Sequence, residues 1–451
     1  MKASPLSSSG LQRLPLTLAL SFALAGVSQA QSLQEVYDMA RGYDATYRAA
    51  RAQYDANLAK AEQGKAALRP QVGLNASATH SDRSVSPQTP ISNFNFSTQT
   101  AGLSASQPLY RPANLASFRQ SQKSLELAQA VLSQAEQDLI VRVSQAYFDV
   151  LTAQDSLSFV QAQKAAVSEQ LASAKRNFEV GTATITDTRE AQARFDLASA
   201  QEIAADNDLR VKRLALELLV GKSGLKPLRL KAGAALSFSD HQGVEQWIAQ
   251  AEQVHPALQQ ARTNLDIAKL ETEKASAGHK PTVDFTLGYN SQKNIGGTNI
   301  AQFTGSNRIN LATAGVTMNL PLYAGNATEN RIRETLALEE KARLDLEGAQ
   351  RQVAQATRTA FLGLQSGLGQ VKAYEAAEVS SQSALDANKL GYQVGVRINI
   401  DVLNSQSQLF QTKRDLAKAR YDVMVGQLKL RQAAGVLKAE DLQSINRLLA
   451  P

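Results

Sequence analysis

A period of two in the hydrophobic positions marks two short regions of the chain, one in each half. Apolar side chains alternate with small or polar ones over residues 72–78 and again over 283–289, which predicts strands with one apolar face. A return strand is expected after a polar loop in each case, so the sequence predicts β-hairpins at 71–108 and 282–321. Such strands are typical of outer-membrane barrels, although the alternation by itself fits a soluble, half-buried hairpin equally well.

The last of the expected strands, 308–320, has an irregular pattern. The apolar residues of 314–320 share one face, whereas Ile309 and Leu311 lie out of phase with them. One extra residue in the strand would bring both sets to the same face, so we expect a β-bulge here.

After each hairpin the hydrophobic period changes to seven, which predicts a coiled coil. The first series is Phe118, Leu125, Leu132, Leu139, Ala146, Ala153, Val160 and Val167, and the second is Leu346, Val353 and Ala360. No proline interrupts residues 113–226. We therefore expect one helix over 112–179, which at about 1.5 Å per residue is about 100 Å long. Shorter single helices are expected over 32–68 and 244–279, each ending before a proline.

The elements occur twice in the same order. The offset between matching motifs drifts only from 211 residues (Pro70 to Pro281) to 214 residues (Gly181 to Gly395). Matching motifs in one order over such a length predict a doubled fold. The organisation we expect is a first repeat over 31–221, an equatorial linker over 222–243, a second repeat over 244–435, and a C-terminal equatorial segment over 436–451.

The long helical stretches are interrupted by two corresponding turns, 178–187 and 392–404. Gly181 and Gly395 suit left-handed C-caps that end the incoming helices. Thr184 and Asp187 have the spacing of a capping box. Asp401 falls in the first turn of the next helix, where the helix dipole favours an anion. Capping alone can explain both acidic residues.

The N-terminus has the pattern of a secretory signal peptide over residues 1–30. Lys2 and Arg13 precede an apolar stretch that closes with Ser28-Gln29-Ala30, a small-x-small cleavage site. Cleavage removes two basic residues and no acidic one, so the formal charge of +7 becomes +5. The sequence thus predicts an exported protein.

Composition excludes several functional classes. The absence of Cys in the 451 residues excludes disulfides, thiol catalysis, Cys-ligated metals and a lipoprotein anchor. The four His are scattered, and no nucleotide-binding or nucleophile motif occurs. Basic residues form no cluster that would suit nucleic acid. We therefore expect no enzyme, no metal and no cofactor.

Four strands cannot enclose a lumen in a membrane, because the open edges of the sheet would leave backbone groups unsatisfied in lipid. The hairpins therefore predict an oligomer in which several copies close one barrel, and the physics leaves the copy number open. The alternative is a soluble periplasmic coiled-coil adaptor or scaffold protein. The repetition of a strand pair before each 65-residue helical stretch argues against it.

The doubled plan of two strands, helix, turn and helix, with the turns 178–187 and 392–403, resembles the TolC family of trimeric outer-membrane channel-tunnels (outer membrane efflux proteins). The stretch 427–442 is similar as well. The resemblance covers essentially all of the mature chain. It implies a mainly α protein with membrane β structure: a homotrimer with a twelve-stranded outer-membrane barrel, four strands per protomer, continued by a periplasmic α-helical coiled-coil barrel.

The resemblance also implies roles for residues of the two turns. Thr186, Asp187, Tyr392 and Arg397 match positions that link inner and outer coils in a closed entrance. Asp401 matches an acidic ring at the constriction. The chain departs from the pattern at Asn404, where the pattern has a second Asp, so the ring should hold three carboxylates. The segments that match adaptor-docking tips are Val180, Gly181 and Thr182 in the first turn and Val394, Gly395 and Val396 in the second.

The implied function is the outer-membrane exit duct of a tripartite efflux pump or a type I secretion system. The implied partners are a periplasmic adaptor (membrane fusion) protein, an inner-membrane transporter and outer-membrane lipid. Because neither the substrate nor the particular pump can be read from the lumen residues, the transported cargo stays open at this point.

Overall fold

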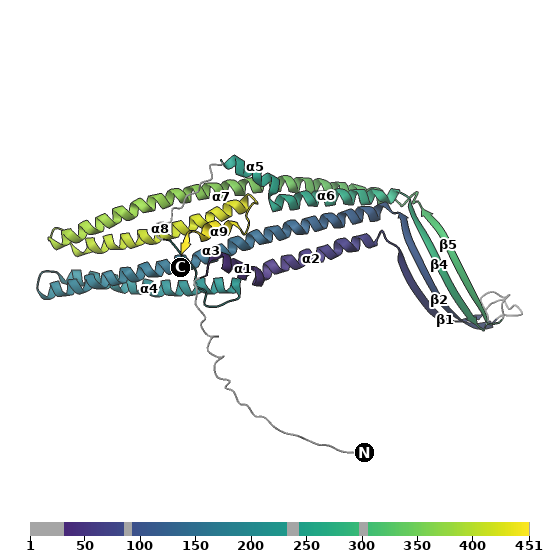
Figure 1. The fold of residues 1–451 in the computed structure, drawn as a ribbon, viewed down its shortest axis with the longest axis horizontal. Helices are drawn as coiled ribbons and strands as arrows, with labels where there is room; N and C mark the ends of the chain where they lie inside the picture. The colour runs from purple at the N-terminus through teal and green to yellow at the C-terminus, as the bar shows by residue number, and fades with distance from the viewer. Residues whose placement is uncertain (1–30, 85–92, 232–242, 297–304, 451) are drawn as a thin grey trace, which may run out of the picture.

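The computed structural model describes residues 31–84, 93–231, 243–296 and 305–450. The molecule is elongated: a β-sheet forms one end, one long helix runs from each hairpin of the sheet to a turn at the other end, and a shorter helix returns from each turn to about the middle (Figure 1). The expected signal peptide, 1–30, lies outside the described residues.

The strands β1 (Gln71–Ser84), β2 (Asn93–Tyr110), β4 (Thr282–Ile295) and β5 (Asn307–Asn319) form one antiparallel sheet. Their order is β1-β2-β4-β5, so the two hairpins join through β2 and β4. Within the protomer, β1 and β5 therefore each present one unpaired edge. An unpaired edge is a template for a further strand.

The β-bulge expected in 308–320 is wrong. The pairing of β5 with β4 runs from Asn319 to Asn307 without a shift. In the described sheet the register shift falls instead between β2 and β4, at Pro108 and Tyr110. Proline has no N–H to give to the ladder, so it favours an irregular position at the end of a strand.

The long helices are α3 (Pro112–Glu179), α4 (Ile185–Val220), α7 (Ala327–Gln393) and α8 (Asn399–Ala433). The helix predicted over 112–179 is thus confirmed. α3 packs along α4, α7 packs along α8, and α3 and α8 join the two pairs (Figure 1). Across the described ranges, no helix combines the length and hydropathy needed to cross a lipid bilayer.

The shorter helices are each broken in two, which corrects the expectation of single helices over 32–68 and 244–279. α1 (Leu33–Tyr43) and α2 (Ala45–Ala66) are separated by Asp44, whose carboxylate accepts the N–H of Tyr47 and so caps α2 (2.7 Å). α5 (Val244–Val254) and α6 (Pro256–Ser276) are separated by His255. His255 is extended because the following proline disfavours the helical conformation before it. A single turn of 3-10 helix, η1 (Ala277–His279), leads to β4.

The linker and the C-terminal segment meet halfway along the helices. β3 (Arg229–Leu230) pairs with β6 (Leu449–Ala450), which follows the short helix α9 (Asp441–Asn446). The largest hydrophobic core lies at this level, where Tyr147, Phe148 and Met424 are fully buried. The two pairs of helices are therefore most firmly joined at the equator, and they reach the tips as two separate hairpins.

Candidate functional site at the helix tips

The first tip is closed by its backbone and capped by a side chain. Gly181 has a φ of +78°, and the N–H of Thr182 donates to the carbonyl of Asn177 (2.8 Å). The hydroxyl of Thr184 accepts the N–H of Asp187 (3.2 Å), while the carboxylate of Asp187 accepts the N–H (2.9 Å) and the hydroxyl (2.7 Å) of Thr184. The expected left-handed C-cap and capping box are both confirmed. The carboxylate of Asp187 is therefore engaged by its own helix.

The second tip closes its backbone in the same way but lacks the cap. Gly395 has a φ of +79°, and the N–H of Val396 donates to the carbonyl of Gly391 (2.9 Å). The N-cap is Ile398, whose side chain offers no hydrogen-bonding atom. Asp401 thus stands at the third position of α8, as Asp187 does in α4, with no hydroxyl to bind it.

The only cation paired with Asp401 in the described structure is Arg397, which precedes it on the same tip. The guanidinium Nη1 lies 3.7 Å from the carboxylate Oδ2, and both side chains are partly exposed. Such a pair contributes about 0–1 kcal/mol. The stem of Arg397 lies against Gly391, where a Cβ would come within 2.7 Å of the arginine Cγ. A glycine is therefore needed for this close approach.

Two of the predicted site residues join the hairpins. The amide of Asn177 donates to the hydroxyl of Tyr392 (3.4 Å), and Nη2 of Arg194 donates to the Asn404 side-chain oxygen (2.8 Å). Among the described residues, the carboxylate of Asp187 is not bonded to Tyr392. The structure thus brings the two turns together, but through partners that the sequence did not identify.

A further link, missed from the sequence, is made by Asn399. Its side chain is fully buried; its oxygen accepts the amide of Gln170, and its amide donates to the backbone carbonyl of Asp187 (3.3 Å). Leu403, one turn further along α8, is fully buried in a cluster with residues of α3 and α4. The signal in the sequence was a lone polar residue between Ile398 and Ile400.

The remaining predicted residues of the tips are exposed. Val180, Val394 and Val396 have exposed fractions of 73%, 65% and 75%. The Thr186 side chain is also exposed and has no hydrogen-bond partner within the part of the chain that the structure describes. The two tips therefore present apolar side chains at the extreme end of the molecule.

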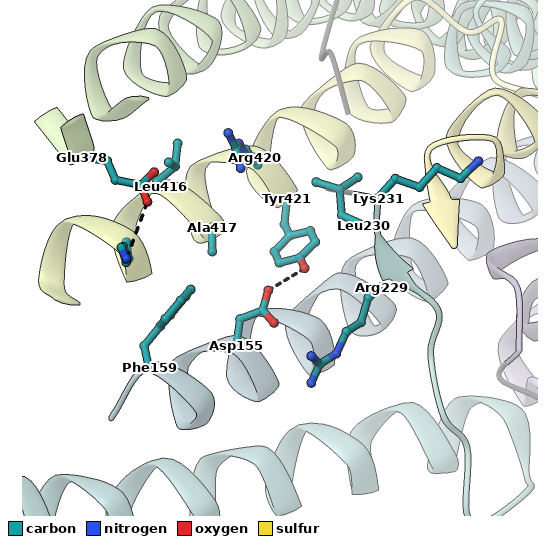
Figure 2. A pocket seen from close by; sticks show the side chains of 11 residues that line it. Asp155, Phe159, Arg229, Leu230, Lys231, Glu378, Leu416, Ala417, Arg420 and Tyr421 are labelled. Atoms are coloured by element: carbon teal, nitrogen blue, oxygen red, sulfur yellow. Dashed lines mark hydrogen bonds and ion pairs between the residues drawn. The ribbon is translucent and has the colours of Figure 1, made fainter. Parts of the chain in front are cut away.

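A pocket of about 370 Å³ lies higher up, between α3, α8 and β3 (Figure 2). The hydroxyl of Tyr421 donates to the carboxylate of Asp155 (2.7 Å), joining α8 to α3 across its floor. Burial raises the pKa of Asp155, although the bond from Tyr421 and the charge of Arg229 oppose that shift. The bond between Tyr421 and Asp155 joins the hairpins at the equator, and no local pattern in the sequence predicts it.

A sheet with one apolar face and two open edges, continued by two helices about 100 Å long that each turn back as a hairpin, defines one protomer of an outer-membrane channel. The outer membrane efflux protein family matches residues 36–222 and 247–436. The chain belongs to this family. The two matched segments coincide with the two halves of the fold.

The outer membrane protein TolC of Vibrio cholerae is 34% identical over 436 residues, which are 96% of this chain and 97% of that protein. The proteases secretion protein PrtF of Dickeya chrysanthemi is 27% identical over 438 residues, 95% of this chain and 93% of that protein. The crystal structure of the Campylobacter jejuni CmeC outer membrane channel superposes with a TM-score of 0.77 at 15% identity, covering 98% of each chain.

The predicted family, fold class and location are thereby confirmed. The protein is an outer-membrane exit channel of the efflux and secretion class, with its helical tunnel in the periplasm. Its relatives are channel proteins rather than enzymes.

Proposed function

We propose that three copies of this chain form a gated duct that is closed at the helix tips and opened by the pump or secretion complex that it serves. The observation that carries the proposal is the arrangement of the protomer: apolar strands at one end, matched tips at the other, and unbroken helices between them (Figure 1). Three copies of four strands give a twelve-stranded barrel. Closing it satisfies the free edges of β1 and β5.

The gate consists of the bonds that hold the second hairpin against the first. Tyr392, Asn399 and Asn404 each bond to the first hairpin of the same protomer. Thr186 and Arg397 have exposed side chains on the two tips, where a neighbouring protomer can meet them, and Asp187 can join them in exchange for its capping bonds to Thr184. Each such bond is worth about 1 kcal/mol, so a partner that binds the open form only moderately better can shift the equilibrium.

The narrowest point of the closed duct is the ring of Asp401. Because Ile398 leaves this carboxylate uncapped, its ion-pair partner in the described structure is the exposed guanidinium of Arg397, with which ions from solution can compete. Three converging carboxylates attract cations and repel anions. Asn404, one turn further along, adds no charge to the ring.

The partners are a periplasmic adaptor protein and an inner-membrane transporter. The exposed valines beside Gly181 and Gly395 offer the adaptor small apolar contacts on rigid turns. Exposed apolar side chains at the end of an exported protein suit a protein partner. The names of the relatives, TolC and the proteases secretion protein PrtF, support both efflux and secretion as uses of this duct.

The test is conductance in planar lipid bilayers with the purified full chain. We expect a small, cation-selective conductance, and we expect Asp401→Ala to move the reversal potential in a salt gradient toward zero. Asp345→Asn is the matched control, because that carboxylate is exposed on α7 and paired with Lys341 (2.7 Å). A protein that inserts without conducting contradicts the duct; an unaltered reversal potential in Asp401→Ala contradicts the ring.

A further inference from the structure

A polar groove of about 390 Å³ runs between the two hairpins directly behind Asn404. Its walls come from α3, α4 and α8. The groove is lined mainly by amide and guanidinium groups, those of Gln163, Arg194, Gln201, Gln408, Gln411 and Arg414. No Asp or Glu lines it. The groove therefore carries two positive charges without compensation from its own walls.

Both arginines donate to amides rather than to carboxylates. Arg194 donates to the side-chain oxygen of Asn404 (2.8 Å), and Arg414 donates to that of Gln411. In the part of the chain that the structure describes, neither arginine forms an ion pair. A guanidinium has five N–H donors, so each retains free donors and its full charge. Both side chains are half-buried, which strengthens their field relative to a fully exposed position.

Three carboxylates of α4 and α8 have partners of their own. Glu202 receives Lys164 (2.8 Å), and Asp196 receives the amide of Gln192 (2.9 Å). Asp415 accepts the amide of Gln411 through both oxygens (2.9 and 2.8 Å). Gln411 thus stands between Asp415 and the guanidinium of Arg414, and Asp415 does not line the groove.

The groove continues the face of α8 on which the acidic ring lies. Positions 401, 404, 408 and 411 follow one another at steps of three and four, which places them on one side of a helix. If Asp401 lines the entrance, as proposed above, the groove opens into the duct just behind the ring.

We propose that this groove binds small organic anions with two or more carboxylates. One carboxylate would take the free donors of Arg194 and a second those of Arg414, while the amides of Gln201 and Gln408 donate to the remaining oxygens. The opening of the groove into the duct rests on the proposed function, whereas the binding site itself does not.

The first test is calorimetric titration of citrate into the detergent-purified full chain at low salt. We expect one citrate per chain, and a loss of about tenfold or more in affinity for Arg194→Gln and for Arg414→Gln, since a hydrogen bond to a charged group contributes about 1.5–3 kcal/mol. Arg414→Lys, which keeps the charge, should retain part of the affinity. Arg343→Gln is the control, because that arginine pairs with Glu340 on α7.

Absence of citrate binding to the native chain overturns the proposal, as does full affinity in Arg414→Gln that melts like the native chain. The second test adds citrate on the barrel side of the channel in a planar bilayer, so that the anion does not have to pass the ring of Asp401. We expect it to reduce the current through the native channel and not through the double variant Arg194→Gln, Arg414→Gln. A conducting channel that is indifferent to citrate contradicts the opening of the groove into the duct; citrate binding without any conductance contradicts the duct alone.

Discussion

The two helix tips have the same backbone and opposite chemistry. Each closes around a glycine with a φ near +80°, +78° at Gly181 and +79° at Gly395. The first helix to follow is capped by Thr184, and the second begins at Ile398 without a side-chain cap. The difference decides whether the carboxylate at the third helical position serves its own helix or is free for another purpose. The replacement of one hydroxyl by an ethyl group at the N-cap can therefore convert a structural acid into a candidate pore charge.

The first helical positions of the two tips also differ. Ile185 and Asn399 correspond in the two repeats, yet the isoleucine is 49% exposed and the asparagine is fully buried. This inverts the usual preference for apolar residues inside. The inversion is explained by the two bonds of Asn399, to Gln170 and to the carbonyl of Asp187. The second tip thus supplies the buried side chain of this contact, and the first hairpin supplies its two hydrogen-bond partners.

The largest effect is expected at Asn399. Asn399→Ala leaves the half-buried Gln170 amide without this partner and removes the second bond to the Asp187 carbonyl, which keeps its helical partner; the expected cost is about 1–3 kcal/mol in all. We expect the closed entrance to lose stability and the single-channel conductance in planar bilayers to rise several-fold (~1.4 kcal/mol is tenfold in an equilibrium).

The corresponding residue of the other tip supplies the control for this prediction. Ile185→Ala removes an exposed side chain, so its conductance should match that of the native channel. If both variants conduct alike, the two tips are equivalent at this position and the asymmetry has no part in gating.

A smaller effect is expected from the double variant Tyr392→Phe, Arg397→Ser. It removes the hydroxyl bonded to Asn177 and the ion pair with Asp401, both partly exposed and each worth about 1 kcal/mol or less. Conductance should rise, but less than in Asn399→Ala.

A double-mutant cycle sharpens this prediction. Tyr392→Phe and Asn177→Ala remove the same contact, so their effects on conductance should be less than additive. Strict additivity would show that the hydroxyl acts through some other group, such as one on a neighbouring protomer.

At these tips, interactions between residues close in the sequence could be predicted, and interactions between distant residues could not. The capping box joins positions three residues apart, so it is visible in the sequence of the first tip, and the glycine C-caps are local as well. The bond from Gln170 to Asn399 joins residues 229 positions apart. No periodicity reports such a pair, because nothing in the local pattern says which faces of the two hairpins meet.

The errors in the shorter helices have a different cause, because their signals were local. The long helix over 112–179 was predicted from a sustained period of seven. The break at His255 is readable from Pro256, because a proline inside a helical pattern ends the helix before it and is favoured at the first position of the next one. The break at Asp44 is readable as well, since Asp44 caps α2 by accepting the N–H of Tyr47. Arg142 of α3 bonds the same carboxylate at 3.0 and 3.1 Å, and that partner lies outside any local window.

Exchanging the caps tests the comparison directly. Ile398→Thr gives α8 a hydroxyl at its N-cap, which should draw the Asp401 carboxylate to it as in the first tip. We expect about 1 kcal/mol of added stability, measured by thermal unfolding, and a partial loss of cation selectivity.

The reciprocal change, Thr184→Val, should cost about 1 kcal/mol and leave selectivity unchanged. A result in which Ile398→Thr stabilises the chain but keeps full selectivity would separate capping from the availability of the carboxylate. The availability of Asp401 to ions would then not depend on the missing cap.

The smallest effect is expected where the hairpins are joined away from the tips. Burial raises the pKa of Asp155 above its ordinary value, so the folded state holds the proton more tightly than the unfolded state does. The contribution of this group to stability is therefore fully present below the ordinary Asp pKa of about 4 and is lost as pH rises through the raised pKa. Asp155→Asn keeps an acceptor for Tyr421 and should make the free energy of unfolding less dependent on pH across that window, measured by denaturant titration in detergent.

Asp345→Asn, an exposed control, should keep the native slope of unfolding free energy against pH. An unchanged slope in Asp155→Asn would mean that the equatorial join does not titrate in this window.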